Sequence, residues 1–224
     1  MAGQKSLDIY FIRHGECLTN LAQAETIGGR SNNDPLSEVG IMQACMLGAY
    51  LAEENIHFDE VYSSPAIRAM ATAKLACHYI SYPLERIVVC DELQELSQGD
   101  WEGKPRAEFY TPEAIAQMDA DHWNFKAPNG ESQRDTEERM LGWVTDKLLP
   151  KYEQGRTVGV FTHGLAIKCL FRGIMESSSE RTYKIEIDNT AITRFRYARN
   201  GWHLVTLNDT THLVGMKSKP SPYF

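Results

Sequence analysis

The sequence predicts an α/β fold, specifically a three-layer α/β/α sandwich with a mainly parallel sheet. Short apolar runs of strand length alternate with longer segments of helical periodicity along the chain. Two of these runs, 7–12 and 157–162, each lead directly into a His-Gly pair. Near the C-terminus, runs at 191–197 and 202–208 flank the Asn-Gly dipeptide at 200–201. That dipeptide is a strong hairpin signal and predicts an antiparallel addition at one edge of the sheet.

The elements of the first half follow in order. After the strand at 7–12 comes a loop rich in Gly and Asn, and Ser37 then caps a helix whose apolar positions recur to Leu51. Residues 61–63 have the composition of a short strand. The Ser-Pro pair at 64–65 predicts the next helix, with the serine as N-cap and the proline at the first helical position.

The second half continues the alternation of strand and helix. Residues 86–90 predict a third strand, and the Thr-Pro pair at 111–112 repeats the cap-plus-proline start of a helix. Apolar residues at helical spacing over 140–148 predict a fourth helix just before the second His-Gly strand. A fifth helix is expected over 165–175.

Composition limits the class of protein. A chain of 224 residues fits a single domain over 1–224, and its formal net charge of -7 argues against nucleic acid or an anionic membrane as a partner. No apolar stretch reaches transmembrane length, and the N-terminus lacks the long apolar region of a signal peptide. The five scattered cysteines form no CxxC pair. We therefore expect a cytoplasmic protein with reduced thiols.

The segment 104–134 differs from the rest of the chain because it mixes charge with aromatic residues and has no clear period. Two interpretations remain open. The segment could form a cap over a functional site, or it could be a surface excursion held together by its own aromatic side chains.

The residues at the two strand ends predict a phosphoryl-transfer site. Because neighbouring parallel strands end at the same edge of a sheet, His14 and His163 are expected to meet there. Arg13 adjoins His14, and Arg68 lies near the start of its helix, where unpaired N–H groups favour an anion. Neutral imidazole is a competent nucleophile, and the guanidinium fork fits phosphate oxygens.

A phosphoryl-transfer site also needs a proton donor for the leaving group. Asp91, Glu92 and Glu95 follow the third predicted strand, and spacing alone does not choose among them. No cysteine is followed six residues later by arginine, as a cysteine-based phosphatase requires, and no His and Asp cluster has metal-ligand spacing. The remaining histidines are expected to be structural: His57, His78, His122, His203 and His212.

Several motifs occur in the order typical of one family. They are Arg13-His14-Gly15-Glu16 with Asn20, 35–40, 62–69, Leu93-Gln94-Glu95 with 99–103, 130–132 and Thr162-His163-Gly164. In these motifs the chain resembles the histidine phosphatase superfamily, the phosphoglycerate mutase-like enzymes. The resemblance touches most of the chain, which makes it far more specific than a single Arg-His-Gly.

The resemblance implies a role for each residue. His14 would be the nucleophile that becomes phosphorylated, and Glu95 would protonate the leaving oxygen and then activate water. Arg13, Arg68 and His163 would hold the phosphoryl oxygens. No metal and no cofactor are implied, because these cationic groups supply the charge that Mg²⁺ supplies in kinases. The resemblance assigns substrate binding to Asn20, Gly164 and Arg106.

Members of the family either hydrolyse a phosphate ester, as phosphatases do, or move a phosphoryl group within a substrate, as mutases do. Mutases typically carry polar residues after the second histidine, whereas this chain continues with Leu165 and Ala166. It also lacks their paired arginines in the cap, where Arg134 stands alone. We therefore expect a phosphatase acting on a small phosphorylated metabolite. A mutase remains an alternative because Arg106 falls where mutases carry a substrate-binding lysine, and a non-catalytic phosphate-binding module is the third.

Cys17 departs from the family pattern, which commonly has Ser or Thr at this position. A thiol is a poorer hydrogen-bond partner than a hydroxyl. Because two positive residues lie close in sequence, we expect Cys17 to be more reactive than an ordinary thiol.

Overall fold

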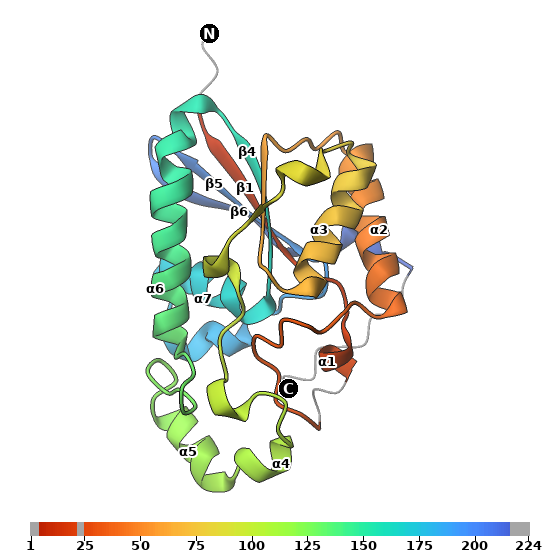
Figure 1. The fold of residues 1–224 in the computed structure, drawn as a ribbon. Helices are drawn as coiled ribbons and strands as arrows, with labels where there is room; N and C mark the ends of the chain where they lie inside the picture. The colour runs from red at the N-terminus through yellow and green to blue at the C-terminus, as the bar shows by residue number, and fades with distance from the viewer. Residues whose placement is uncertain (1–4, 22–24, 216–224) are drawn as a thin grey trace.

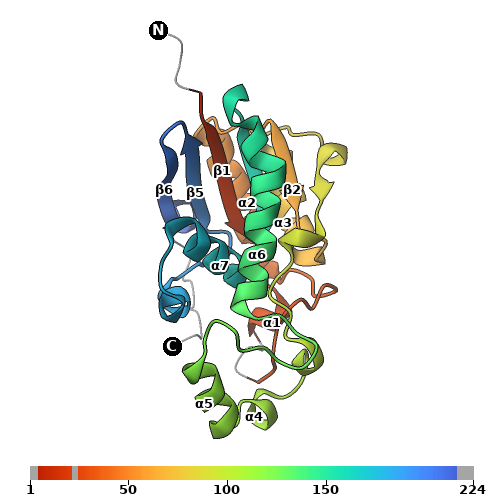
Figure 2. The same ribbon diagram turned by 90° about the vertical axis from the view of Figure 1, so that its left-hand side faces the viewer.

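The computed structural model describes residues 5–21 and 25–215. The described residues contain one six-stranded sheet in the order β3-β2-β4-β1-β5-β6. Strands β1 to β4 run parallel, while β5 and β6 are antiparallel at one edge (Figures 1 and 2). The strands are β1 (Leu7–Arg13), β2 (Glu60–Ser63), β3 (Val88–Val89), β4 (Thr157–Thr162), β5 (Ile192–Ala198) and β6 (Gly201–Asp209).

Helices cover both faces of the sheet. Helices α2 (Glu38–Glu53) and α3 (Ile67–Tyr79) lie on one face, and α6 (Gln133–Trp143) and α7 (Gly164–Met175) lie on the other (Figure 1). Short helices fill the connections: α1 (Leu18–Leu21), α4 (Arg106–Phe109), α5 (Pro112–Ala120), a π-helix at Val144–Leu148, and 3₁₀ turns at Leu84–Arg86, Asp91–Leu93, Gly99–Trp101, Leu149–Gln154, Ser179–Lys184 and Thr211–Leu213. None of the helices within the described ranges combines the length and the apolar character that spanning a membrane requires.

The side-chain alternation of β1 shows why the sheet needs two helical layers. Leu7, Ile9 and Phe11 are fully buried in the core beneath α6 and α7. Tyr10 and Ile12 point the other way, into the core beneath α2 and α3. A strand that is apolar on both faces is stable only when both faces are covered. The predicted three-layer sandwich is thereby confirmed.

Two of the three predicted N-caps are confirmed, and the helix predicted over 140–148 begins earlier, at Gln133. The Ser37 hydroxyl accepts a hydrogen bond from the Gly40 N–H, and Thr111 caps α5 with proline at the first position. The prediction for Ser64 is wrong, because α3 begins at Ile67 and has Ala66 at its N-cap. The Ser64 hydroxyl is instead 2.8 Å from His163 Nε2. The Ser64 hydroxyl, which the local pattern assigns to capping the helix, therefore contacts a residue distant in sequence.

The third strand is shorter than predicted. Of residues 86–90, only the two residues of β3 pair as a strand, and the preceding Leu84–Arg86 forms a 3₁₀ turn. Both valines of β3 are exposed at the edge of the sheet, so little burial is available to extend the pairing. The predicted hairpin of β5 and β6 is confirmed, with Gly201 at φ +98° in its turn.

Residues 104–134 lie at the end of the molecule toward which β1 runs (Figures 1 and 2). The segment contains α5 as expected and also α4, which the sequence pattern does not signal. Trp101 packs against three aromatic rings of this segment, those of Phe109, Tyr110 and Phe125, with centroids 5.8 to 6.0 Å apart. The aromatic side chains therefore hold the segment to the loop that carries Glu95.

Candidate active site

The two strand-end histidines meet, as the parallel arrangement predicts. Strands β1 and β4 are neighbours in register, with Arg13 opposite Thr162, so the next residue of each strand is a histidine at the same edge. The ring centroids of His14 and His163 are 5.1 Å apart. His14 is 3% exposed and His163 is fully buried.

Arg68 joins both imidazoles. Its Nε donates to His14 Nε2 at 3.2 Å, and its Nη2 donates to His163 Nδ1 at 3.1 Å. The same guanidinium also donates to the carbonyls of Ser31 and Arg30. Since α3 begins at Ile67, Arg68 lies in the first turn of that helix. The sequence-based placement of Arg68 beside the histidines is confirmed.

The hydrogen bonds assign the proton positions of His14. Its Nδ1 is 2.7 Å from the Gly15 carbonyl, which only accepts, so Nδ1 carries the proton. Nε2 accepts from Arg68 and therefore holds the lone pair. By the same reasoning, His163 donates from Nε2 to Ser64. Each ring is a neutral imidazole with a fixed orientation.

Electrostatics keep both rings neutral. Burial lowers the pKa of His14 well below the ordinary value of 6.5, and the charges of Arg68 and Arg13 lower it further. Burial and the charge of Arg68 do the same to the pKa of His163. His14 Nε2 is therefore unprotonated at neutral pH, and it can act as a nucleophile once the Arg68 hydrogen bond is released.

Arg13 forms one wall of a cavity of about 70 Å³, which we call the inner pocket. Residues around it include Arg13, His14, Asn20, Arg68, Glu95 and Lys168. Arg13 Nη1 donates to the Ile187 carbonyl at 2.6 Å, while its buried Nε has no hydrogen-bond partner among the residues that the structure describes. A Cβ at Gly164 would approach that Nε to 3.2 Å. Glycine at 164 therefore leaves room for the guanidinium beside the start of α7.

Of the three candidate acids, only Glu95 lines the inner pocket. Its Oε1 accepts from the Ala166 N–H at 2.9 Å, and its Oε2 accepts from the Leu165 N–H at 3.1 Å. These are N–H groups of the first turn of α7, which has no helical partners for them. Asp91 and Glu92 are exposed, as expected for solvated surface charges.

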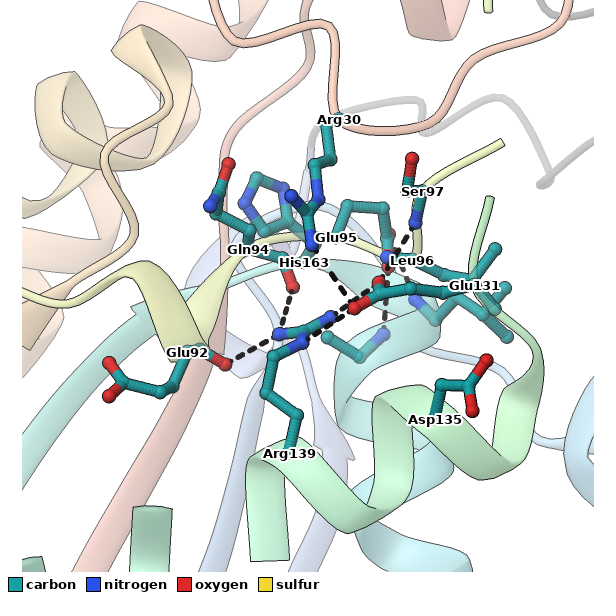
Figure 3. A network of polar contacts seen from close by, with 12 residues as sticks. Arg30, Glu92, Gln94, Glu95, Leu96, Ser97, Glu131, Asp135, Arg139 and His163 are labelled. Carbon is teal, nitrogen blue, oxygen red and sulfur yellow. Dashed lines mark hydrogen bonds and ion pairs between the residues drawn. The ribbon is translucent and has the colours of Figure 1, made fainter. Parts of the chain in front are cut away.

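A partly buried ion pair between Arg139 and Glu131 holds the loop that carries Glu95 (Figure 3). Arg139 of α6 donates from Nη1 to the carbonyl of Glu92 at 2.6 Å and to that of Gln94 at 3.1 Å. Glu131 accepts from the Ser97 N–H at 3.1 Å on the other side of Glu95. Burial alone would raise the pKa of Glu131, but the hydrogen bond and charge of Arg139 lower it. Glu131 belongs to a motif noted in the sequence, whereas Arg139 was missed because only the fold brings it to this loop.

The family assignment rests on the length of the match. Residues 9–210 match the family model of the histidine phosphatase superfamily (branch 1). The chain belongs to the histidine phosphatase superfamily.

Relatives within the superfamily carry different activities. A 2,3-bisphosphoglycerate-dependent phosphoglycerate mutase of Azorhizobium caulinodans is 30% identical over 190 residues, covering 84% of this chain and 91% of that protein. The solved structure of YhfR from Bacillus stearothermophilus is 27% identical with a TM-score of 0.79, covering 92% of this chain and 99% of that one. A phosphoserine phosphatase from Entamoeba histolytica is 25% identical with a TM-score of 0.76 and the same coverage.

The segment after β1 contains two residues singled out in the sequence, Asn20 and Cys17. Asn20 Oδ1 accepts from the Cys17 N–H and from Asn189 Nδ2, so the loop after β1 is fixed beside the inner pocket. The expectation that Cys17 is reactive is wrong. Burial and a hydrogen bond with Asp34 raise the pKa of its thiol to about 12. The thiol is 1% exposed, and its apparent proximity to cations is outweighed by loss of solvent.

Arg106 does not line the inner pocket. It lines a second cavity of about 210 Å³, which we call the outer chamber. Its guanidinium lies over the Tyr110 ring, 4.4 Å from the centroid. The chamber adjoins the inner pocket, since both are lined by Gly28, Leu96, Leu165 and Tyr183, among others. Any contact of Arg106 with substrate would therefore be with a part remote from the phosphoryl group.

Lys168 is a pocket residue that the sequence reasoning missed. It is 8% exposed and lines the inner pocket together with Arg13 and Glu95. Burial, with a contribution from the charge of Arg13, lowers the pKa of Lys168 to about 8. A signal was available, because Lys168 follows Gly164 by four residues and so shares its face of the helix.

Proposed function

We propose that this chain is a metal-independent phosphomonoesterase that works through a phosphohistidine at His14. The observation that carries the proposal is the bridge from Arg68 to both imidazoles, which fixes His14 beside the inner pocket with Nε2 unprotonated; the hydrogen bond from Arg68 must pass to a phosphoryl oxygen before Nε2 attacks. Members of this family act on small phosphorylated substrates. The substrate is accordingly a phosphomonoester whose phosphoryl group enters the inner pocket.

In the first step, His14 Nε2 attacks phosphorus and the bond to the ester oxygen breaks. Glu95, protonated, transfers its proton to the departing oxygen. Arg13 and Arg68 line the pocket beside the phosphoryl oxygens, Lys168 adds a further positive charge, and His163 acts from behind through its hydrogen bond with Arg68. In the second step, Glu95 as carboxylate takes a proton from water, whose oxygen attacks phosphorus while the P–N bond breaks. Phosphate leaves, and both His14 and Glu95 return to their starting forms.

The alternative function is a phosphoglycerate mutase, which the names of the sequence relatives favour. A mutase must retain a bisphosphorylated intermediate, which requires polar and cationic contacts beyond the reacting histidine. Leu165 lines both cavities at the point where they meet, and an apolar side chain there gives a departing phosphoacid no hydrogen bond. This supports hydrolysis. A purely phosphate-binding module is disfavoured by Glu95, because such a module has no need of a carboxyl group in the pocket that holds the phosphate.

We also propose that residues 104–134 act as a cap and form part of the single domain. Arg106, Tyr110 and Phe125 of this segment line the outer chamber, which supports the cap over the alternative of a surface excursion alone. The net charge of -7 and five free cysteines support a cytoplasmic protein that acts on free metabolites, without nucleic acid or membrane as a partner.

The proposed function is tested by turnover of p-nitrophenyl phosphate after extensive treatment with EDTA. Among residues 5–21 and 25–215, no group of three or more His, Cys, Asp or Glu is arranged to hold a metal ion. We expect full activity, since cationic side chains surround the phosphoryl site. Loss of activity in EDTA that is restored by a divalent metal would contradict the mechanism.

A further inference from the structure

The outer chamber contains a buried amide without partners. Gln133, the first residue of α6, is 1% exposed and lines the chamber. Neither its Oε1 nor its Nε2 has a hydrogen-bond partner among the residues that the structure describes. A buried polar group normally finds a partner, because leaving one unpaired is costly. An amide beside a cavity is therefore placed to pair with something that enters the cavity.

The remaining walls of the chamber are largely apolar and aromatic. Tyr110, Phe125, Met118 and Ile27 line it, together with Tyr183 at the boundary with the inner pocket. Such walls suit the flat or apolar part of a ligand, and a small number of polar groups then fix its orientation. The chamber, at about 210 Å³, is larger than the inner pocket of about 70 Å³.

The charges that line the chamber balance. Among the described residues these are two cations, Arg106 and Lys126, and two carboxylates, Asp119 and Glu131. Lys126 also pairs with Asp135 at 3.3 Å, and Glu131 pairs with Arg139 at 2.8 Å and with Arg30 at 3.1 Å. The charges of the lining side chains therefore sum to zero, and two of the four are already engaged in ion pairs outside the chamber.

We propose that the outer chamber binds the alcohol portion of the substrate, and that this portion combines an apolar or aromatic group with an amide-like donor and acceptor that pair with Gln133. The inference rests on the proposed phosphatase function and adds the class of leaving group. The shared lining of Gly28, Leu96, Leu165 and Tyr183 joins the chamber to the inner pocket. One ester can therefore occupy both cavities at once.

Three alkyl phosphates separate the contributions: butyl phosphate, 4-phenylbutyl phosphate and the phosphate ester of N-(2-hydroxyethyl)benzamide. The last two have the same length and ring, and differ in whether an amide is present. We expect KM to fall from butyl to phenylbutyl because the ring is buried, and to fall again, by roughly tenfold, for the amide. KM is the readout because the chamber lies away from the reacting atoms.

The decisive variant is Gln133→Leu. It is expected to raise KM for the benzamide ester about tenfold, to leave KM for butyl phosphate unchanged, and to leave kcat near that of the unaltered protein. Gln117→Leu is the matched control, because Gln117 is exposed on α5 within the same segment. An equal rise in KM for all three esters, or none for the benzamide ester, would overturn the assignment and indicate that Gln133 is structural.

Competition by the free alcohols keeps the inference testable if Gln133→Leu does not fold. N-(2-hydroxyethyl)benzamide should inhibit hydrolysis of butyl phosphate by the unaltered protein more strongly than 4-phenylbutanol does, and equal inhibition would overturn the role of the amide. Failure of the phosphatase proposal gives a different result, namely no hydrolysis of any of the esters. Hydrolysis of all three esters with equal KM would reject the proposal for the outer chamber and leave the phosphatase proposal standing.

Discussion

Arg139 and Glu131 form a two-point ion pair, with Nε 2.9 Å from Oε1 and Nη2 2.8 Å from Oε2. The pair contacts the backbone on both sides of Glu95, because Arg139 donates to the Gln94 carbonyl and Glu131 accepts from the Ser97 N–H (Figure 3). A helix on one face of the sheet thereby fixes the loop that carries the proposed acid. The planar guanidinium is needed for this, since one cation makes four contacts in two directions.

Arg139→Lys keeps the charge and removes the fork. We expect kcat on an alkyl phosphate to fall by about tenfold, because a small displacement of a proton donor slows transfer strongly. The fall should be smaller on p-nitrophenyl phosphate, whose leaving group needs little protonation. Affinity for vanadate should not change, since Arg139 does not line the inner pocket. Arg156→Lys, in a half-exposed pair with Asp59, is the control, and a parallel loss of vanadate affinity would show a merely structural effect.

The second prediction concerns the nucleophile. His14→Ala should abolish turnover, and incubation with a labelled substrate should leave no acid-labile phosphate on the protein, because no other residue in the inner pocket is placed to replace Nε2. His203→Ala, at an exposed position on β6, should retain both turnover and labelling. Residual turnover or labelling in His14→Ala would require a different nucleophile.

The third prediction assigns the acid. General acid catalysis contributes a factor of about 10² to 10⁴, so Glu95→Gln should slow hydrolysis of an alkyl phosphate by that order. The glutamine retains an acceptor for the N–H groups of Leu165 and Ala166, which preserves the loop. Hydrolysis of p-nitrophenyl phosphate should suffer less. Equal losses on the two substrates would argue against Glu95, and Glu92→Gln provides the matched control on the exposed side of the same loop.

The fourth prediction follows from Lys168, whose pKa is lowered to about 8 from 10.5. Its charge at the inner pocket is lost as pH rises through 8, so affinity for phosphate should fall above that pH. Lys168→Met should bind phosphate more weakly at pH 7 and lose much of this alkaline dependence. Lys74→Met, exposed on α3, should behave as the unaltered protein does. A pH dependence retained in full by Lys168→Met would assign it to another group.

The lowered pKa of Lys168 also makes the stability of the folded protein depend on pH. Between pH 8 and 10.5 the unfolded chain binds this proton more fully than the folded protein does, so the contribution of Lys168 to stability rises with pH through that window. Lys168→Met should therefore be more stable than the unaltered protein at pH 7, by up to about 3 kcal/mol, and the difference should shrink toward pH 10. Urea unfolding at the two pH values measures it.

The parts of the site that could be predicted are those fixed by strand ends. His14 and His163 follow parallel neighbours, and Arg68 follows the next strand in a helix start, so local pattern and sheet geometry place all three. The prediction of Ser64 as the N-cap of α3 is wrong, and the Ser64 hydroxyl instead forms a hydrogen bond with His163. Residues such as Arg139 and Gln133 gave no sequence signal for a site. They reach the loop and the chamber only through the packing of α6, which side-chain periodicity alone does not specify.

The last prediction separates phosphatase from mutase. A mutase must hold the bisphosphorylated intermediate until one of its phosphoryl groups has returned to the histidine. Here Leu165 lies where the inner pocket meets the outer chamber, and the charges of the chamber balance. Incubation with 3-phosphoglycerate and a trace of 2,3-bisphosphoglycerate should therefore give little 2-phosphoglycerate, while a phosphomonoester with an apolar alcohol should release phosphate.

The Arg106→Ala variant tests the same choice from the other side, because Arg106 is one of the two cations that line the chamber and, by the family resemblance, falls where mutases carry a substrate-binding lysine. If the protein is a phosphatase, this variant should change KM for bulky esters and leave hydrolysis of butyl phosphate intact. Interconversion of the two monophosphoglycerates faster than phosphate release, lost in Arg106→Ala and in Arg134→Ala, would establish a mutase. Those two arginines would then anchor the carboxylate of the phosphoacid, and water rather than product would be excluded from the phosphohistidine.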